Sequence, residues 1–130
     1  MADEAYPAVT HQLARARRDL ARGAATVFHE LDQAVFAKGA LSTKAKHVIA
    51  IAVAHVTQWP YCIRGHTHAA LRDGASEQEL MEAIWVAAEM RAGAAFAHSV
   101  LAVSEMESRT DRQSDDASGT VGSRREHRVG

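Results

Sequence analysis

The chain has 130 residues, enough for one small domain, and its formal net charge is −1 at pH 7. It has no basic stripe interleaved with aromatic residues, so nucleic-acid binding is not expected. It also has no long uncharged apolar run and its N-terminus is acidic, so we expect no membrane segment or secretory signal and predict a cytoplasmic protein. Apolar residues make up 47% of the chain but aromatic residues only 5%. This alanine-rich composition favours closely packed helices.

Two helices are predicted before residue 40. Thr10 is a suitable N-cap for a first helix that runs to about Arg22, where Gly23 interrupts the apolar periodicity. A second helix is expected over residues 24–38, with Gly39 as the glycine that follows its C-terminus.

The next two helices contain the most apolar part of the chain. Ser42 is the expected N-cap of a helix that continues to about residue 58 and is apolar all round, which predicts a buried central helix. Pro60 suits the first turn of a fourth helix that runs to about Arg72, and Asp73-Gly74 provides its stop signal. The short link between the two helices requires them to turn back on each other.

A capping box opens the following helix. Ser76 and Glu79 have the S-x-x-E spacing in which each side chain satisfies the backbone N–H of the other residue. Gly93 is expected to end this helix, and a sixth helix should cover residues 94–104. The sequence therefore predicts an all-α domain of about six helices.

The C-terminal part of the chain changes in composition. From about residue 107, charges of both signs alternate with Ser, Gly and Asp, and almost nothing apolar is available for burial. Such a segment is typical of disorder. We predict a helical domain over residues 1–106 and a disordered polar tail over residues 107–130.

The only cysteine, Cys62, is the strongest candidate for chemistry. It falls at the third position of the helix that begins at Pro60, where unpaired N–H groups and the helix dipole favour a thiolate. His66 follows one turn later on the same face. Such a pair can act as nucleophile and base or as two metal ligands, although a cysteine at a helix start can also be an inert apolar residue.

Other residues are predicted to surround this pair. His47 lies far enough along the preceding helix to face Cys62 and His66 once the two helices pack. Three residues are expected to line a pocket around them: Trp59, His55 and Tyr61. Packing is an alternative role for Trp59, and His55 could instead contact that tryptophan one turn later.

The segment LSTKAKHVIAIAVAHVTQWPYCIRGHTHAALRDGASEQELMEAI resembles the core of the carboxymuconolactone decarboxylase superfamily. The likeness spans residues 41–95 and is closest to the alkylhydroperoxidase D-like branch. That branch typically reads L-S-x-K-x-K-E-L-I-A-L-A-V-A, then C-x-Y-C-I-x-x-H, then G-A-[ST]-x-x-E-[IL]-x-E-A. The resemblance implies an all-α, six-helix fold that assembles as a homo-oligomer, either a trimer or a hexamer.

The resemblance also implies a peroxidase in which a cysteine pair reduces hydroperoxides. The attacking cysteine of the branch matches Cys62, and its relay histidine matches His66. Two positions depart from the pattern, because Trp59 replaces the first cysteine and His47 replaces the relay glutamate. A cycle based on Cys62 alone needs an external thiol reductant to reduce its sulfenic acid.

Three functional hypotheses follow. The first is a hydroperoxide-reducing oxidoreductase in which Cys62 attacks and His66 and His47 relay protons, with no cofactor required. The second is a metal-binding protein or metalloenzyme that holds zinc, copper or iron through His47, Cys62 and His66, since imidazole and thiolate suit these metals. The third is a family member of the decarboxylase type or one without catalytic activity.

Overall fold

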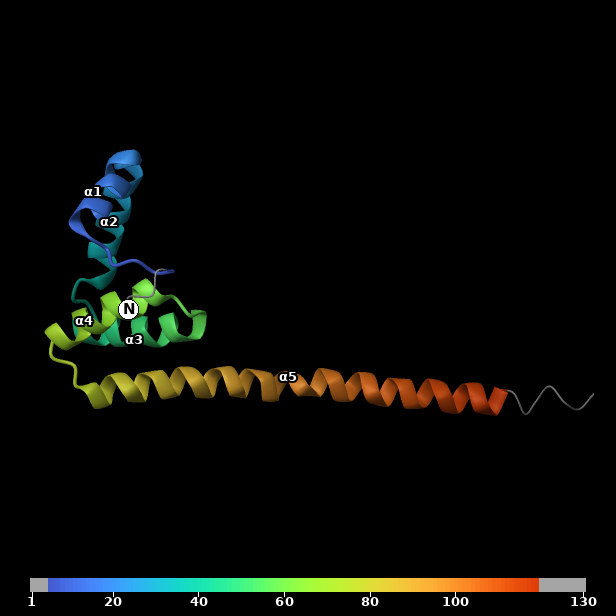
Figure 1. Ribbon diagram of the computed structural model, residues 1–130. Coiled ribbons are helices and arrows are strands. Elements are labelled where there is room, and N and C mark those ends of the chain that lie inside the picture. The colour runs from blue at the N-terminus through green and yellow to red at the C-terminus, as the bar shows by residue number, and fades with distance from the viewer. Residues whose placement is uncertain (1–4, 120–130) are drawn as a thin grey trace, which may run out of the picture. The chain divides into compact units, whose positions relative to one another are not determined.

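The computed structural model describes residues 5–119, and over these residues the regular structure is entirely helical (Figure 1). The elements are α1 (His11–Leu20), α2 (Arg22–Phe36), α3 (Thr43–Thr57), α4 (Pro60–Arg72) and α5 (Glu77–Gly119). The predicted all-α class is confirmed. None of the helices in the described range is long and apolar enough to cross a membrane. The chain divides into two units, residues 1–89 and 90–130, and the candidate site lies wholly in the first.

α1 begins as predicted but ends earlier. The Oγ1 atom of Thr10 accepts a hydrogen bond of 3.2 Å from the backbone N–H of Leu13, which caps the helix. The helix ends at Leu20 because Ala21 leaves the helical region, with φ −148° and ψ 60°. Gly23 lies inside α2, so the prediction that it separates the two helices is wrong. Near a helix start most N–H groups have no helical partner in any case, and a glycine there does not break the helix.

α2 ends through contacts with α3 and not through a glycine. The helix stops at Phe36, and Gly39 does not have the positive φ expected of a glycine cap. Instead, the Nζ of Lys46 donates a hydrogen bond to the carbonyl oxygen of Val35 (2.7 Å). The Oγ1 of Thr43 donates to the carbonyl oxygen of Phe36 (3.0 Å). Side chains distant in sequence thus satisfy the last carbonyl groups of α2 and hold its end against α3.

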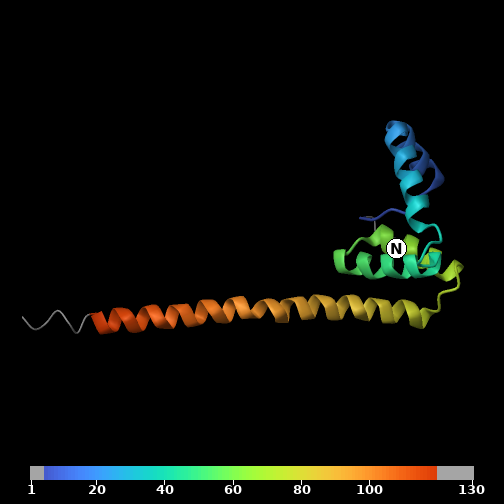
Figure 2. The same cartoon turned by 180° about the vertical axis from the view of Figure 1, so that it is seen from behind.

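α3 and α4 lie side by side, as both views show (Figures 1 and 2). Gln58 adopts the left-handed conformation, with φ 57°, a geometry that costs roughly 1 kcal/mol in a non-glycine residue. The backbone N–H groups of Gln58 and Trp59 both donate to the carbonyl oxygen of Ala54, and Pro60 then starts α4. This tight reversal is the one that the sequence predicts between the two helices.

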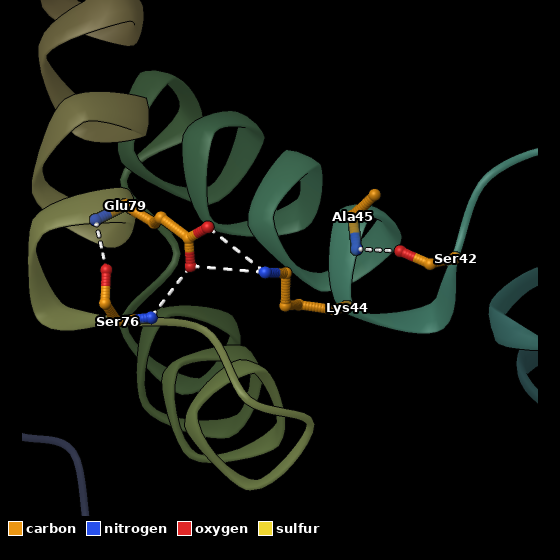
Figure 3. Close-up of polar contacts among 5 residues, drawn as sticks. All are labelled: Ser42, Lys44, Ala45, Ser76 and Glu79. Atoms are coloured by element: carbon orange, nitrogen blue, oxygen red, sulfur yellow. Dashed lines mark hydrogen bonds and ion pairs between the residues drawn. The ribbon is translucent and has the colours of Figure 1, made fainter.

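The capping box at the start of α5 forms as predicted (Figure 3). The backbone N–H of Glu79 donates to the Oγ of Ser76 (3.1 Å), and the N–H of Ser76 donates to the Oε2 of Glu79 (2.8 Å). Lys44 Nζ of α3 lies 3.1 Å from Glu79 Oε1. The pKa of Glu79 is lowered, first by the N–H of Ser76 and then by Lys44. The box therefore also links the start of α5 to α3.

The core of the first unit joins α3, α4 and the beginning of α5. Its buried members come from all three helices and from the α4–α5 link, and two half-buried residues pack against them: Ile51, Ala70, Ala75 and Leu80, with Val48 and Ile84. Most of these side chains are small, so the helices approach closely. The close approach of α3 and α4 is what places their polar side chains within contact distance of one another.

The C-terminal region differs most from expectation. A single helix, α5, replaces the predicted fifth and sixth helices, so the described residues form five helices and not six. Gly93 lies within α5 between two alanines, and the cost of a helical glycine, about 1 kcal/mol relative to alanine, does not interrupt it.

Residues 107–119, expected to be disordered, continue α5. There the hydroxyl groups of Ser108 and Thr110 donate to carbonyl oxygens four residues earlier, so the polar side chains bond to the helix itself. Residues 120–130 of the predicted tail lie outside the described residues. The division into a domain over 1–106 and a tail over 107–130 stays a prediction.

Candidate functional site

Two histidines from neighbouring helices form the centre of the candidate site. His47 belongs to the buried face of α3 and is 9% exposed, while His66 is half-buried on α4. Their Nδ1 atoms lie 3.0 Å apart, so one ring donates an N–H to the lone pair of the other. Their positions on α3 and α4 therefore bring together two of the three residues predicted to act chemically.

Phe36 closes one side of this pair. Its ring stacks on His47 with centroids 4.6 Å apart and planes inclined by 10°, and on His66 with centroids 5.0 Å apart. This role of Phe36 is not predicted from the sequence, in which the residue is only one of several apolar positions near the end of a helix. Lys46 and Thr43 hold the end of α2, and so keep the phenyl ring against both imidazoles.

An acidic residue adjoins the other end of the pair. Asp73 follows the last residue of α4, and its Oδ2 lies 3.6 Å from the Nε2 of His47. From the sequence, Asp73 is predicted only to be part of a helix stop signal. Nothing in the spacing shows that the chain direction after Arg72 returns this carboxylate to α3.

The surroundings of His66 favour its neutral form. Burial lowers the pKa of the His66 imidazole below its usual 6.5, and the adjacent His47 lowers it further, while the carboxylate of Asp32 acts in the opposite direction. The ring is therefore predominantly unprotonated at pH 7. A neutral imidazole can accept a proton, which is the requirement for a general base.

Cys62 and His66 line the same pocket, whose volume is about 320 Å³. Most of the lining is apolar and comes from the end of α2, from α3 and from the start of α4: Val35, Phe36, Ile49, Ala50, Val53, Ala54 and Trp59. Trp59 is one of these lining residues. The apolar residues of α3 were not predicted to line it, because the sequence assigns them to the core.

The two remaining predicted pocket residues have other partners. The Nδ1–H of His55 donates to the carbonyl oxygen of Ile51, 2.7 Å away on its own helix. The hydroxyl of Tyr61 donates to the carbonyl oxygen of Pro7 (2.9 Å), and its ring meets Tyr6 edge-on at 6.1 Å. Neither residue is among those that line the pocket of Cys62.

The structure does not assemble the predicted metal ligands. Within residues 5–119 there is no group of three or more His, Cys, Asp or Glu side chains that could hold a metal ion. His47 and His66 direct their Nδ1 atoms at each other, and the Nε2 of His47 faces Asp73. Both nitrogens of His47 are thus engaged, and the triplet with Cys62 is not arranged around a common point.

Comparison with known proteins agrees with this architecture. Residues 22–105 match the carboxymuconolactone decarboxylase family. A relative from Paracoccus denitrificans, described as uncharacterized protein 4 in cox locus, is 61% identical over 72 residues. The match covers 55% of this chain and 65% of that relative, so the chain spans slightly less than two thirds of the relative's length.

Two solved structures share the fold. One is the apo form of a carboxymuconolactone decarboxylase family protein from Legionella pneumophila, with 37% identity and a TM-score of 0.56 over 61% of this chain and 70% of that one. The other is a protein from Methanobacterium thermoautotrophicum, with 33% identity and a TM-score of 0.59 over 62% of this chain and 91% of that one.

Proposed function

The chain belongs to the carboxymuconolactone decarboxylase family, and from this premise we propose that it is a hydroperoxide-reducing oxidoreductase of the alkylhydroperoxidase D-like kind. The observation that carries the proposal is the shared pocket: Cys62 and His66 line one apolar cavity, and His66 is held from behind by His47. A thiol needs a base to become a nucleophile, and the lowered pKa of His66 supplies a neutral one.

The reaction begins with proton transfer from the thiol of Cys62 to the imidazole of His66. The thiolate then attacks the terminal oxygen of a hydroperoxide, the O–O bond breaks, and the proton is delivered to the departing alkoxide. Cys62–SH and ROOH thus give Cys62–SOH and ROH, and the sulfur is oxidised as the peroxide is reduced. The mostly apolar lining suits an organic hydroperoxide, whose carbon chain would occupy the cavity.

Recovery of the thiol requires a second reactant, because the chain has one cysteine. An external thiol R′SH condenses with Cys62–SOH to give a mixed disulfide and water. A second R′SH then releases Cys62–SH and R′SSR′. The proposed partner is therefore a small or protein thiol reductant, and the cycle needs no cofactor.

Assembly with further copies of the chain is part of the proposal. Many large apolar side chains of the first unit are exposed, including Phe28, Trp59 and Trp85. Apolar surface of this extent on a small domain usually marks an interface. We expect a homo-oligomer, and the family resemblance indicates a trimer or a hexamer.

The test is direct detection of sulfenic acid. Purified, reduced protein is mixed with cumene hydroperoxide, and the Cys62 adduct of a sulfenic-acid trap is measured by mass spectrometry. We expect rapid modification in the wild type and none in Cys62→Ser.

The role of His66 is tested in the same assay. His66→Gln should slow the reaction by about 100-fold, the lower end of general-base effects. His68→Gln, an exposed position two residues along the same helix, is the matched control and should react at the wild-type rate. Equal rates for His66→Gln and wild type would contradict the proposal.

A further inference from the structure

Asp73, His47 and His66 form a continuous polar series across the α3–α4 contact. The Oδ2 of Asp73 lies 3.6 Å from the Nε2 of His47, and the Nδ1 of His47 lies 3.0 Å from the Nδ1 of His66. Both imidazoles are covered on one side by the stacked ring of Phe36. The side chain of His47 is 11% exposed and that of Asp73 29%, so solvent screens their interaction only in part.

From this series we infer that Asp73 is a positioning residue that fixes the tautomers of both histidines and thereby makes Nε2 the basic atom of His66. This inference deepens the proposed function and rests on it for its catalytic consequence. Asp73 acts through His47 and does not itself touch the pocket.

The assignment follows from donor and acceptor counts. A neutral imidazole carries one N–H, and the short Nδ1–Nδ1 contact requires one ring to donate and the other to accept. The carboxylate of Asp73 favours a proton on the nitrogen of His47 that faces it, which is Nε2. The Nδ1 of His47 is then the acceptor, and His66 must donate from Nδ1. The lone pair of His66 consequently resides on Nε2.

The opposite arrangement would misplace the base. With the proton of His47 on Nδ1, His66 would use its Nδ1 lone pair to accept, and its Nε2 would carry the hydrogen and could not take a proton from Cys62. Asp73 disfavours this state, because a bare Nε2 lone pair would then face the carboxylate. The Asp73 side chain is not needed to cap α4, because the end of the helix is capped by the backbone N–H of Asp73, which donates to the carbonyl oxygens of Ala69 and Leu71.

The test reads the tautomers directly. Nitrogen-15 chemical shifts of His47 and His66 are measured by long-range proton–nitrogen correlation in the full-length reduced protein at pH 7.5. In the wild type we expect a protonated Nε2 on His47 and a protonated Nδ1 on His66. Asp73→Asn, which keeps the size and the backbone cap, should mix the two tautomers of each ring. It should also slow oxidation by cumene hydroperoxide about tenfold. Arg72→Gln is the matched control, because Arg72 Nε lies 4.0 Å from Oδ1 of Asp73, whereas the oxygen that faces His47 is Oδ2.

The outcomes separate the two proposals. Mixed tautomers in Asp73→Asn together with slow oxidation support the inference. Wild-type tautomers in Asp73→Asn overturn it, even if the wild type reacts rapidly with peroxide and the proposed function stands. If the wild type does not react with cumene hydroperoxide while Asp73→Asn still mixes the tautomers, the peroxidase proposal fails and the positioning role is retained. If Asp73→Asn proves unstable, Asp73→Glu, which keeps the charge, should retain the wild-type tautomers, and their loss would also overturn the inference.

Discussion

The two faces of α3 have the same residue spacing and opposite surroundings. His47, Ile51 and Ala54 follow one another at steps of four and three residues and are buried within the chain. Ile49, Val53 and Val56 repeat the same steps two residues later and are exposed. Ile51 is fully buried at 0% exposure, whereas Ile49 is 49% exposed.

The comparison shows that apolar character alone does not decide which face of a helix enters the core. The buried face meets α4 and the start of α5, and it contributes both the central isoleucine and the buried histidine of the site. The outer face contributes Ile49 and Val53 to the pocket of Cys62 and presents the remaining apolar area to solvent. A helix that is apolar all round can therefore serve the fold on one side and the pocket on the other.

The largest effect is expected from truncation of the buried face. Ile51→Ala should lower the free energy of unfolding by about 3 kcal/mol, because it removes a fully buried side chain and leaves a cavity among α3, α4 and the start of α5. The measurement is urea denaturation followed by circular dichroism. Ile49→Ala, measured at the same protein concentration, is the matched control on the exposed face and should cost less than about 1 kcal/mol. Equal losses for the two variants would show that the faces are not distinct in the native protein.

A second, intermediate effect is expected on the exposed face. Val56→Ser should leave the helical signal unchanged but shift the protein toward smaller species, because Val56 is exposed on this face outside the pocket and we propose that another copy covers it. Light scattering coupled to size-exclusion chromatography gives the mass of each species. A wild type that remains monomeric at micromolar concentration would contradict the proposed oligomer and leave the exposed face of α3 without a role in assembly.

What the sequence could predict depends on how far apart in the chain the contacting residues lie. Contacts between residues close in sequence were predicted correctly, such as the N-caps at Thr10 and Ser42 and the reciprocal box of Ser76 and Glu79. The turn after α3 belongs to this class. Each depends on a side chain and a backbone group within a few residues, so the pattern determines the geometry.

Features that depend on distant parts of the chain were not predicted. Phe36 stacks on both histidines because Lys46 and Thr43 fix the end of α2, a set of contacts that no local pattern encodes. Asp73 approaches His47 only because α4 returns along α3. The meeting of His47 and His66 could be anticipated, since the short turn forces the two helices together. The ring nitrogens engaged, and hence the absence of a three-ligand group in the described residues, could not.

The smallest effect is a pH dependence of stability caused by His66 of α4, whose ring contacts His47 on the buried face of α3. The folded pKa of His66 lies below its unfolded value of 6.5, through burial and the neighbouring His47, with Asp32 in partial opposition. The unfolded chain therefore binds a proton more readily between these two pKa values, and stability rises with pH in that window. This contribution is fully present above pH 6.5 and is lost as the pH falls through the lowered folded value.

His66→Gln should thus show a smaller loss of unfolding free energy between pH 7.5 and 5.5 than the wild type, in urea titrations at both pH values. His68→Gln, exposed on the same helix, should retain the wild-type difference. A wild type whose stability does not decrease over this range more than that of His66→Gln would mean that burial and the contact with His47 do not disfavour the charged imidazole. The neutral base assigned to the pocket would then lose its support.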